Sequence, residues 1–380
     1  MEQHLYEPVH EDFRDLCRQF LAREAVPYHA EWEKAGRVDR EVWRKAGAAG
    51  LLGLDVDEEY GGGAQRDFRF NAVLVEELCR AGTSGLGFAL HNDVVAPYLT
   101  DLTTEDQRKR WLPGFCSGDL VTAIAMSEPG AGSDLAGVRT TAVRDGDTYV
   151  LNGQKTFITN GEMADLVIVV AKTAADQGAH GVSLIAVETG TPGFTRGRRL
   201  EKVGLKANDT AELFFSDCRV SVDNLIGTEN QGFYHLMGNL PRERLSIAVA
   251  AVGAAEVILA QTLEYARTRQ AFGRTIGSFQ HNRFLLAELD TEITIARTFL
   301  NHCIAEFNAG RLTITDADKA KYWTTELQTK VADRCVQLHG GYGYMMEYPV
   351  ARAWLDSRVQ TIYGGTTEIM KEIIGRGLGL

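Results

Sequence analysis

The hydrophobic periodicity of this chain changes twice, and each change limits the folds that the sequence can adopt. Apolar residues follow a helical period over residues 10–120, a strand pattern over 140–226, and a helical period again from residue 232. A helix buries one stripe of side chains, whereas a strand buries alternating positions. The order therefore predicts a helical part, then a β part, then a second helical part.

The two helical parts carry specific signals. One apolar stripe at i, i+3 and i+4 spacing consists of Phe13, Leu16, Cys17, Phe20 and Leu21. Helical periodicity continues over 72–78 and 86–99, and Thr104-Glu-Asp-Gln107 predicts a capping box that opens another helix. Long amphipathic helices are expected over residues 245–267, 279–307 and 317–338.

The middle part is predicted to be an all-β module of about a hundred residues. Its short apolar runs lie at residues 120–125, 166–170, 182–186 and 212–215. The dipeptides Asp145-Gly146, Asn152-Gly153 and Asn160-Gly161 are typical of turns between strands. The expected domains are an N-terminal α-helical domain at 1–120, a middle β domain at 121–230 and a C-terminal α-helical domain at 231–380.

Composition excludes some classes of function. The chain has a net charge of −11, which argues against a nucleic-acid-binding protein because such a protein needs a basic face. Its six Cys are scattered, with no C-x-x-C pair and no His at metal-ligand spacing, so we expect free thiols in a reducing compartment and no metal site.

Targeting signals are absent from the printed sequence. Residues 1–5 form no basic and apolar leader, and the longest apolar stretch, 247–260, is interrupted by Glu256 and is too short to span a bilayer. We therefore expect a cytoplasmic protein that does not bind membranes.

Residues 125–137, Ala-Met-Ser-Glu-Pro-Gly-Ala-Gly-Ser-Asp-Leu-Ala-Gly, follow the first predicted strand of the β part. Gly130 and Gly132 carry no side chain, so this loop can approach a phosphate or a planar heterocycle closely. The loop is not a G-x-G-x-x-G dinucleotide fingerprint, because Leu135 stands where the third Gly would fall. A Rossmann NAD enzyme is therefore disfavoured.

The interpretation of this loop depends on two further segments, Lys155-Thr-Phe-Ile-Thr-Asn160 and Gln337-Leu-His-Gly-Gly-Tyr-Gly-Tyr344. Together and in this order, the three segments resemble those of the acyl-CoA dehydrogenase family of flavoenzymes, most closely its long-chain branch. The resemblance runs from Glu31-Trp-Glu-Lys-Ala-Gly36 to Ile362-Tyr-Gly-Gly-Thr366. It therefore covers the whole chain.

The resemblance implies an α+β fold of three parts: an N-terminal helical domain, a middle antiparallel β-barrel-like domain and a C-terminal four-helix bundle. It also implies an FAD-dependent oxidoreductase of fatty-acid metabolism that converts an acyl-CoA to the trans-2-enoyl-CoA. A homotetramer and an electron-transfer flavoprotein as electron acceptor are expected as well.

The resemblance further implies the residues that hold FAD. Around the isoalloxazine and the nearby pyrophosphate, the expected contacts are Ile124, Met126, Ser127, Gly132, Ser133, Phe157, Ile158 and Thr159. From a neighbouring subunit, the expected contacts to the pyrophosphate and the adenine half are Arg269, Gln280, Gln337, Gly340 and Gly341. Thr366 and Glu368 would bind phosphate and ribose. Phe157 stands where many relatives carry Trp.

The catalytic base departs from the pattern of many relatives, which carry a Glu just before a Gly-Thr in the carboxy-terminal loop. Here that position is Gly364, which cannot act as a base. The long-chain and isovaleryl branches place the Glu far upstream, and this chain has Pro241-Arg-Glu243-Arg244 there. We therefore expect Glu243 to be the base. Two neighbouring Arg would lower the pKa of this carboxylate, whereas a base needs burial to raise it.

The expected substrate contacts surround this base. They are Ser133, Tyr234, Pro241, Arg242, Arg244, Tyr363, Gly364 and Gly365. Arg244 is expected to point away and support the loop at Tyr363, while Gly364 leaves room for the thioester and offers its N–H to the carbonyl.

Two alternatives share the scaffold. One is an oxidase, or a specialised dehydrogenase of a branched or unusual acyl thioester, and the other is a catalytically silent subunit that lends half-sites to a partner. The resemblance favours medium to long acyl groups. The sequence does not fix chain length, branching, pathway or the physiological electron acceptor.

Overall fold

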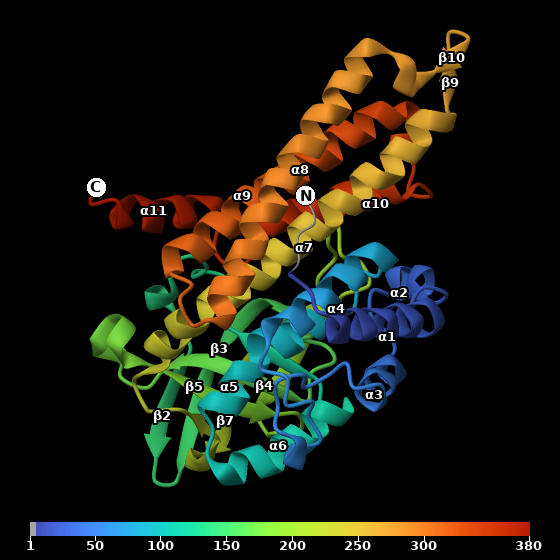
Figure 1. Cartoon of the computed structure of the whole chain (residues 1–380). Helices are drawn as coiled ribbons and strands as arrows, with labels where there is room; N and C mark the ends of the chain where they lie inside the picture. Colours follow the sequence, from blue (N-terminus) through green and yellow to red (C-terminus); the bar gives the residue numbers. More distant parts are fainter. Residues whose placement is uncertain (1–4) are drawn as a thin grey trace.

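The N-terminal helices form one side of the molecule (Figure 1). The computed structural model describes residues 5–380. The helices here are α1 (Pro8–Glu24), α2 (His29–Ala35), α3 (Arg40–Ala48), α4 (Phe68–Ala81), the π-helix η2 (Leu90–Val95), α5 (Ala96–Asp101) and α6 (Glu105–Ser117). Thr104 and Gln107 exchange side-chain and backbone hydrogen bonds at the start of α6, which confirms the predicted capping box.

The helical segment expected over 86–99 is present over 88–101, but its middle part is a π-helix. Gly82 ends α4 in the left-handed conformation, and the chain is helical again from residue 88, where η2 follows and runs into α5. A π-helix widens the turn by one residue and is found frequently at functional sites. Here it presents buried polar side chains, His91, Asn92 and Asp93, to the rest of the protein.

One eight-stranded sheet forms the middle part. Its strands are β1 (Thr122–Ala125), β2 (Thr141–Asp145), β3 (Thr148–Thr159), β4 (Leu166–Lys172), β5 (Val182–Glu188), β6 (Phe194–Arg199), β7 (Thr210–Ser221) and β8 (Leu225–Ile226). The strand order is β6-β7-β3-β2-β4-β5-β8, with β1 beside β4. Most pairs are antiparallel as expected, but β1 and β2 each pair with β4 in parallel.

Strand β4 is buried on both faces. Leu166, Ile168 and Val170 pack in a core with α5 and α6, whereas Val167 and Val169 pack in a second core on the opposite face. A strand that is covered on both faces has a continuous rather than alternating apolar sequence. The sheet is therefore a layer between two hydrophobic cores.

A long helical bundle completes the chain. It contains α7 (Gly232–Thr268), α8 (Gln280–Asn308), α9 (Ile314–His339), α10 (Pro349–Ser357) and α11 (Thr367–Gly377). The hairpin of β9 (Gln270–Ala271) and β10 (Arg274–Thr275) joins α7 to α8 at the tip of an arm that projects away from the sheet (Figure 1). Helix α7 starts earlier than predicted and includes Pro241.

Helix α7 is long and apolar enough to cross a membrane by length and composition, contrary to the expectation from residues 247–260. However, 61% of its most apolar window is buried inside the protein. Such burial is typical of the central helix of a bundle, which is hydrophobic all round because it packs on every side.

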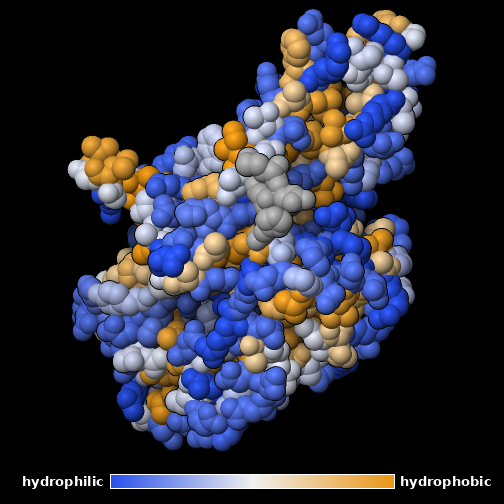
Figure 2. Space-filling view, in the orientation of Figure 1, coloured by the Kyte–Doolittle hydropathy of each residue, from blue (hydrophilic) through white to orange (hydrophobic). Residues whose placement is uncertain are grey.

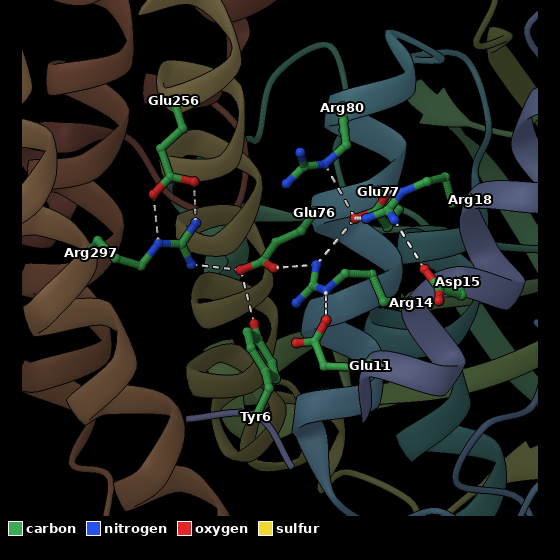
Figure 3. Close-up of polar contacts among 10 residues, drawn as sticks. All are labelled: Tyr6, Glu11, Arg14, Asp15, Arg18, Glu76, Glu77, Arg80, Glu256 and Arg297. Carbon is green, nitrogen blue, oxygen red and sulfur yellow. Dashed lines mark hydrogen bonds and ion pairs between the residues drawn. The ribbon is translucent and has the colours of Figure 1, made fainter. Parts of the chain in front are cut away.

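A buried ion network joins the N-terminal helices to the bundle (Figure 3). Glu76 of α4 accepts hydrogen bonds from Arg14 of α1 at 2.9 Å and from Arg297 of α8 at 2.6 Å. Arg297 also binds both carboxylate oxygens of Glu256 on α7. Such bidentate, charge-assisted contacts fix geometry as well as charge. The network therefore aligns α4 with α7, the helix that carries the predicted base.

Candidate active site

Glu243 lies on α7 with its side chain turned into the protein. It is 6% exposed, and its Oε1 accepts a hydrogen bond from the hydroxyl of Tyr98 on α5 at 3.0 Å. Burial raises the pKa of Glu243 to about 7, although the Tyr98 hydrogen bond and the charge of Arg244 oppose that rise. A carboxylate in this state can accept a proton near neutral pH.

The two neighbouring arginines are turned away from Glu243. Arg242 pairs with Asp55 at 2.7 Å, and Arg244 pairs with the fully buried Asp318 at 2.5 Å. Their charges are therefore largely neutralised by other carboxylates. This explains why burial dominates the pKa of Glu243 despite the flanking sequence.

Two cationic side chains donate hydrogen bonds to the backbone of the loop between η8 (Arg358–Thr361) and α11. Arg244 donates to the carbonyl oxygen of Gly364 at 3.3 Å, as expected for its supporting role, and Lys321 donates to that of Gly365 at 2.6 Å. Both glycines have positive φ, 63° and 100°, which other residues adopt only with strain.

The space beside Gly364 is smaller than expected. A Cβ atom at this position would lie 2.3 Å from Cδ1 of Ile247, one helical turn after Glu243. Ile247 therefore occupies the volume that a side chain at 364 would need. The prediction that Gly364 leaves room for substrate requires this correction, because α7 takes part of that room.

The loop that follows β1 is tied to β3. Lys155 of β3 donates to the carbonyl oxygen of Met126 at 3.1 Å and pairs with Glu128 at 2.8 Å, and the Thr156 N–H donates to the Ser127 carbonyl at 3.0 Å. Gly132 faces open space, so the loop leaves its outer side free for a ligand. The structure thus brings together the two segments expected to meet the isoalloxazine.

Phe157 is held on the surface by a β-bulge. The register between β3 and β7 shifts between Lys155 and Ile158, and Phe157 has a φ of 60° and is 71% exposed. Ile158 points into the core and Thr159 is half-buried. An exposed aromatic side chain on a strained backbone is a common mark of a binding position.

Ile124 and Met126 connect this loop to the base. Both belong to the hydrophobic core that also contains Tyr98 and Leu236, the latter two turns before Glu243 on α7. The flavin-side loop and the base therefore border one apolar region. Ser133, in contrast, is exposed at the outer end of the loop.

Residues expected to bind the adenine half lie at the other end of α7. Arg269, Gly340 and Gly341 line a cavity of about 580 Å³ together with Tyr265 and His339. Neither glycine would place a Cβ against another atom, so both leave open space. The exposed Gln337 lies on the last turn of α9 and the exposed Gln280 begins α8.

The two groups of residues expected to bind FAD lie far apart in the chain. Arg269 follows Glu243 by 26 residues of α7, which corresponds to about 39 Å at the rise of an α-helix. Figure 1 shows the tip of this arm far from the sheet that carries Thr159.

The remaining predicted residues have separate positions. Thr366 caps α11 by accepting from the Ile369 N–H at 3.4 Å, and Glu368 is exposed on its first turn. The Tyr363 hydroxyl donates to Gln360, and the half-buried Pro241 interrupts the hydrogen bonds of α7 just before Glu243. The Tyr234 hydroxyl meets Nδ1 of His180 at 2.9 Å near the start of α7.

Comparison with known proteins assigns the family. Three family models match: acyl-CoA dehydrogenase N-terminal domain at residues 7–119, middle domain at 123–218 and C-terminal domain at 230–379. The chain belongs to the acyl-CoA dehydrogenase family. It is thus an oxidoreductase, and its activity is the FAD-dependent dehydrogenation of acyl-CoA in fatty-acid oxidation.

Individual relatives agree along the whole chain. The long-chain specific acyl-CoA dehydrogenase, mitochondrial, of Sus scrofa is 51% identical over 98% of this chain and 87% of its own length. The crystal structure of an acyl-CoA dehydrogenase from Geobacillus kaustophilus is also 51% identical, with a TM-score of 0.98, and covers 99% of this chain and 100% of that chain.

A more distant relative shows a reduced flavin. The glutaryl-CoA dehydrogenase from Mycobacterium smegmatis, solved in complex with FADH2, is 27% identical with a TM-score of 0.90 and covers 98% of this chain and 95% of its own. Three features of this acyl-CoA dehydrogenase fit a bound flavin nucleotide. Gly132, Gly340 and Gly341 leave open space, Phe157 is exposed, and Arg269 lines a cavity.

Sequence reasoning missed several residues of this site. Tyr98, Lys321 and Asp318 touch or support the predicted base and its loop, yet each is an isolated residue in a helical pattern. Lys155 and Glu128 stand inside the recognised motifs, but their pairing across 27 positions leaves no local signal.

Proposed function

We propose that this acyl-CoA dehydrogenase acts on medium to long acyl groups, with Glu243 as the base that takes the α-proton. The observation that carries the assignment of the base is the buried Glu243 carboxylate, whose pKa burial raises to about 7. The relatives named for long-chain substrates, 50–51% identical to this chain, support the size of the acyl group.

The chain's own residues account for proton transfer. Glu243 accepts the α-proton, the electron pair of that C–H bond forms the α,β double bond, and the β-hydrogen leaves with its own electron pair. FAD, when bound, supplies the acceptor for that hydride. Polarisation of the thioester carbonyl by a backbone N–H, for which Gly364 is the candidate, makes the α-carbon acidic enough.

FAD is proposed to lie between subunits of a homotetramer, with electrons leaving to an electron-transfer flavoprotein. Support comes from the distance of about 39 Å along α7 between Glu243 and Arg269, which places the cavity at Arg269 beyond the reach of the same flavin. Met126, Ser127 and Thr159 would contact the isoalloxazine, and Arg269 of a neighbouring subunit would neutralise the pyrophosphate.

The proposed location is the cytoplasm. The six cysteines are all free thiols, and five of them are buried, which suits a reducing compartment. Fractionation of cells that express the tagged protein would test this, and enrichment with membranes would contradict it.

A screen of acyl-CoAs tests the proposed substrate. The purified holoenzyme is mixed anaerobically with saturated acyl-CoAs of increasing chain length and with branched ones, and flavin bleaching is followed. We expect the highest kcat/KM with medium to long unbranched chains and slow reoxidation in air. Bleaching by short or branched substrates alone would overturn the proposal, and fast reoxidation in air would indicate an oxidase.

A further inference from the structure

Glu243 accepts a hydrogen bond from a buried side chain to which the proposed reaction assigns no role. Tyr98 lies on α5 and is fully buried, and its hydroxyl is 3.0 Å from Oε1 of Glu243. Within residues 5–380, no second hydrogen bond to the Glu243 carboxylate is found. One oxygen is therefore fixed by protein and the other remains available.

Tyr98 is itself held in place. Its ring packs in the core formed by α5, α6 and β4, next to Val95 and Leu99. Burial raises the pKa of Tyr98 well above its ordinary value, the Glu243 carboxylate raises it further, and a hydrogen bond with Asn239 lowers it. The hydroxyl therefore stays protonated and acts as a donor throughout the working pH range.

The backbone that carries this pair is fixed by contacts on either side. Ser246 donates to Asp93 of η2, which also accepts from Asn71 at 2.6 Å, and Arg242 donates to the Asn92 carbonyl at 3.1 Å. These contacts lock α7 to η2, the segment that leads directly into α5. The distance between Tyr98 and Glu243 is thus set by packed secondary structure rather than by flexible loops.

We propose that Tyr98 is a positioning residue for the base: its hydroxyl holds Oε1 of Glu243 so that Oε2 is presented to the α-proton. A buried carboxylate without such a partner can rotate about its last two bonds, which reduces the share of the time it spends in the reactive geometry. The inference rests on the proposed role of Glu243.

Tyr98 also adjusts the proton affinity of Glu243. A hydrogen bond to a carboxylate favours the charged form, which is the form that accepts the proton. The other charged groups around Glu243 are engaged elsewhere: Arg242 with Asp55, Arg244 with Asp318, Asp93 with Ser246 and Asn71, and Lys321 with the Gly365 carbonyl. The charge of Arg244 also lowers the pKa of Glu243, but Tyr98 is the residue that hydrogen-bonds to the carboxylate itself.

The experiment is a pH profile of flavin reduction in Tyr98→Phe. The holoenzyme is mixed anaerobically with a saturating acyl-CoA found active in the screen, between pH 5.5 and 9. Loss of a hydrogen bond to a charged group should move the kinetic pKa up by about one pH unit. Below that pKa the rate should fall about tenfold, and above it the rates should converge to within a few-fold.

Two companion variants make the test specific. Tyr60→Phe removes a tyrosine hydroxyl that lies 3.0 Å from an exposed glutamate, Glu105, and should leave the pH profile unchanged. Replacement of Tyr98 by 3,5-difluorotyrosine keeps the shape and strengthens the donor, so its kinetic pKa should shift down. This variant tests the proposal even if Tyr98→Phe folds poorly.

The outcomes separate the two hypotheses. An unshifted profile in both Tyr98 variants, with rates equal to those of the unmodified enzyme at high pH, would overturn the role of Tyr98 while Glu243 remains the base. If Glu243→Gln reduces flavin at the rate of the unmodified enzyme, the assignment of the base itself fails, and the inference about Tyr98 fails with it.

Discussion

The buried position that suits Glu243 to proton transfer also costs the folded protein stability, because the charged carboxylate is removed from water. Its pKa rises from 4.5 to about 7 on folding, so between these values the native state keeps a proton that the unfolded chain loses. Stability must therefore fall as the pH rises through this range. Above pH 7 the full cost of the buried charge applies, about 3 kcal/mol.

Glu243→Gln removes this titration. We expect the variant to be more stable than the unmodified protein at pH 8, with little difference at pH 4.5–5, where Glu243 is protonated in the native state. Apparent melting temperatures of the two FAD-loaded proteins at both pH values provide the measurement. An equal difference at the two pH values would show that the burial of this charge does not govern the effect.

Gly364 and Ile247 give a second prediction at the scale of single residues. Moving the carboxylate from α7 to the loop with Glu243→Gly and Gly364→Glu forces a side chain against Ile247 and onto a positive φ. We expect weak activity from this pair of changes. Adding Ile247→Ala should increase the rate of flavin reduction, because it opens the volume needed at 364.

Ile247→Ala alone is the control for that comparison. It should not raise activity in the protein that retains Glu243. If the double and triple variants are equally active, the contact between Ile247 and position 364 has no influence on where a base can act.

At the scale of elements, the buried pair of Lys155 and Glu128 ties the loop between β1 and β2 to β3. Burial lowers the pKa of Lys155 to about 8, while Glu128 keeps a lowered pKa because hydrogen bonds from Lys155 and Thr140 outweigh its burial. Both groups are therefore charged at neutral pH. Glu128 also accepts from the N–H groups of Arg139 and Thr140, so it closes the loop at its far end.

Lys155→Met should leave Glu128 as a buried charge without its counter-ion. We expect a loss of about 3–5 kcal/mol and weaker FAD binding, because the loop that carries Ser127 and Met126 loosens. Denaturant unfolding and flavin content measure both effects. Lys34→Met, which breaks the exposed pair with Glu31, is the matched control and should change stability by less than about 0.5 kcal/mol. Equal losses in the two variants would contradict this account.

At the scale of the whole molecule, the projecting arm carries surface that suits contact with other subunits. Figure 2 shows hydrophobic residues on the arm. In the bundle that forms it, exposed aromatic or aliphatic residues include Phe284 and Ile295 of α8, Trp354 of α10, and Tyr344 between α9 and α10. An apolar surface of this kind is typical of a protein–protein interface. The cavity at Arg269 lies on the same arm.

Arg269→Ala should therefore weaken FAD binding and the oligomer together. The guanidinium is expected to bind the pyrophosphate of a flavin whose other half belongs to the neighbouring subunit. Flavin content and analytical ultracentrifugation of the same preparation give the two readouts. Arg267→Ala, on the exposed end of α7, is the control. A stable monomer with full flavin content would contradict a site shared between subunits.

The sequence predicted the arrangement of helical and β parts because periodicity is a local property of each segment. Glu243 lies two residues before the helix predicted over 245–267, and the structure extends α7 to include it. The flanking arginines suggested a lowered pKa for this carboxylate. What the sequence could not predict was which distant groups neutralise those arginines, since Asp55 and Asp318 are far away in the chain. Tyr98, Ile247 and Lys155 were missed for the same reason: their roles arise from tertiary contacts alone.

The most direct test of the account is the rate at which substrate reduces the flavin in Glu243→Gln. Glutamine keeps the shape and can still accept the Tyr98 hydrogen bond, but it cannot accept a full proton. We expect FAD content and ligand binding to persist while the limiting rate falls by about 10²–10⁴-fold. A rate close to that of the unmodified enzyme would show that the base lies elsewhere and would contradict the central claim.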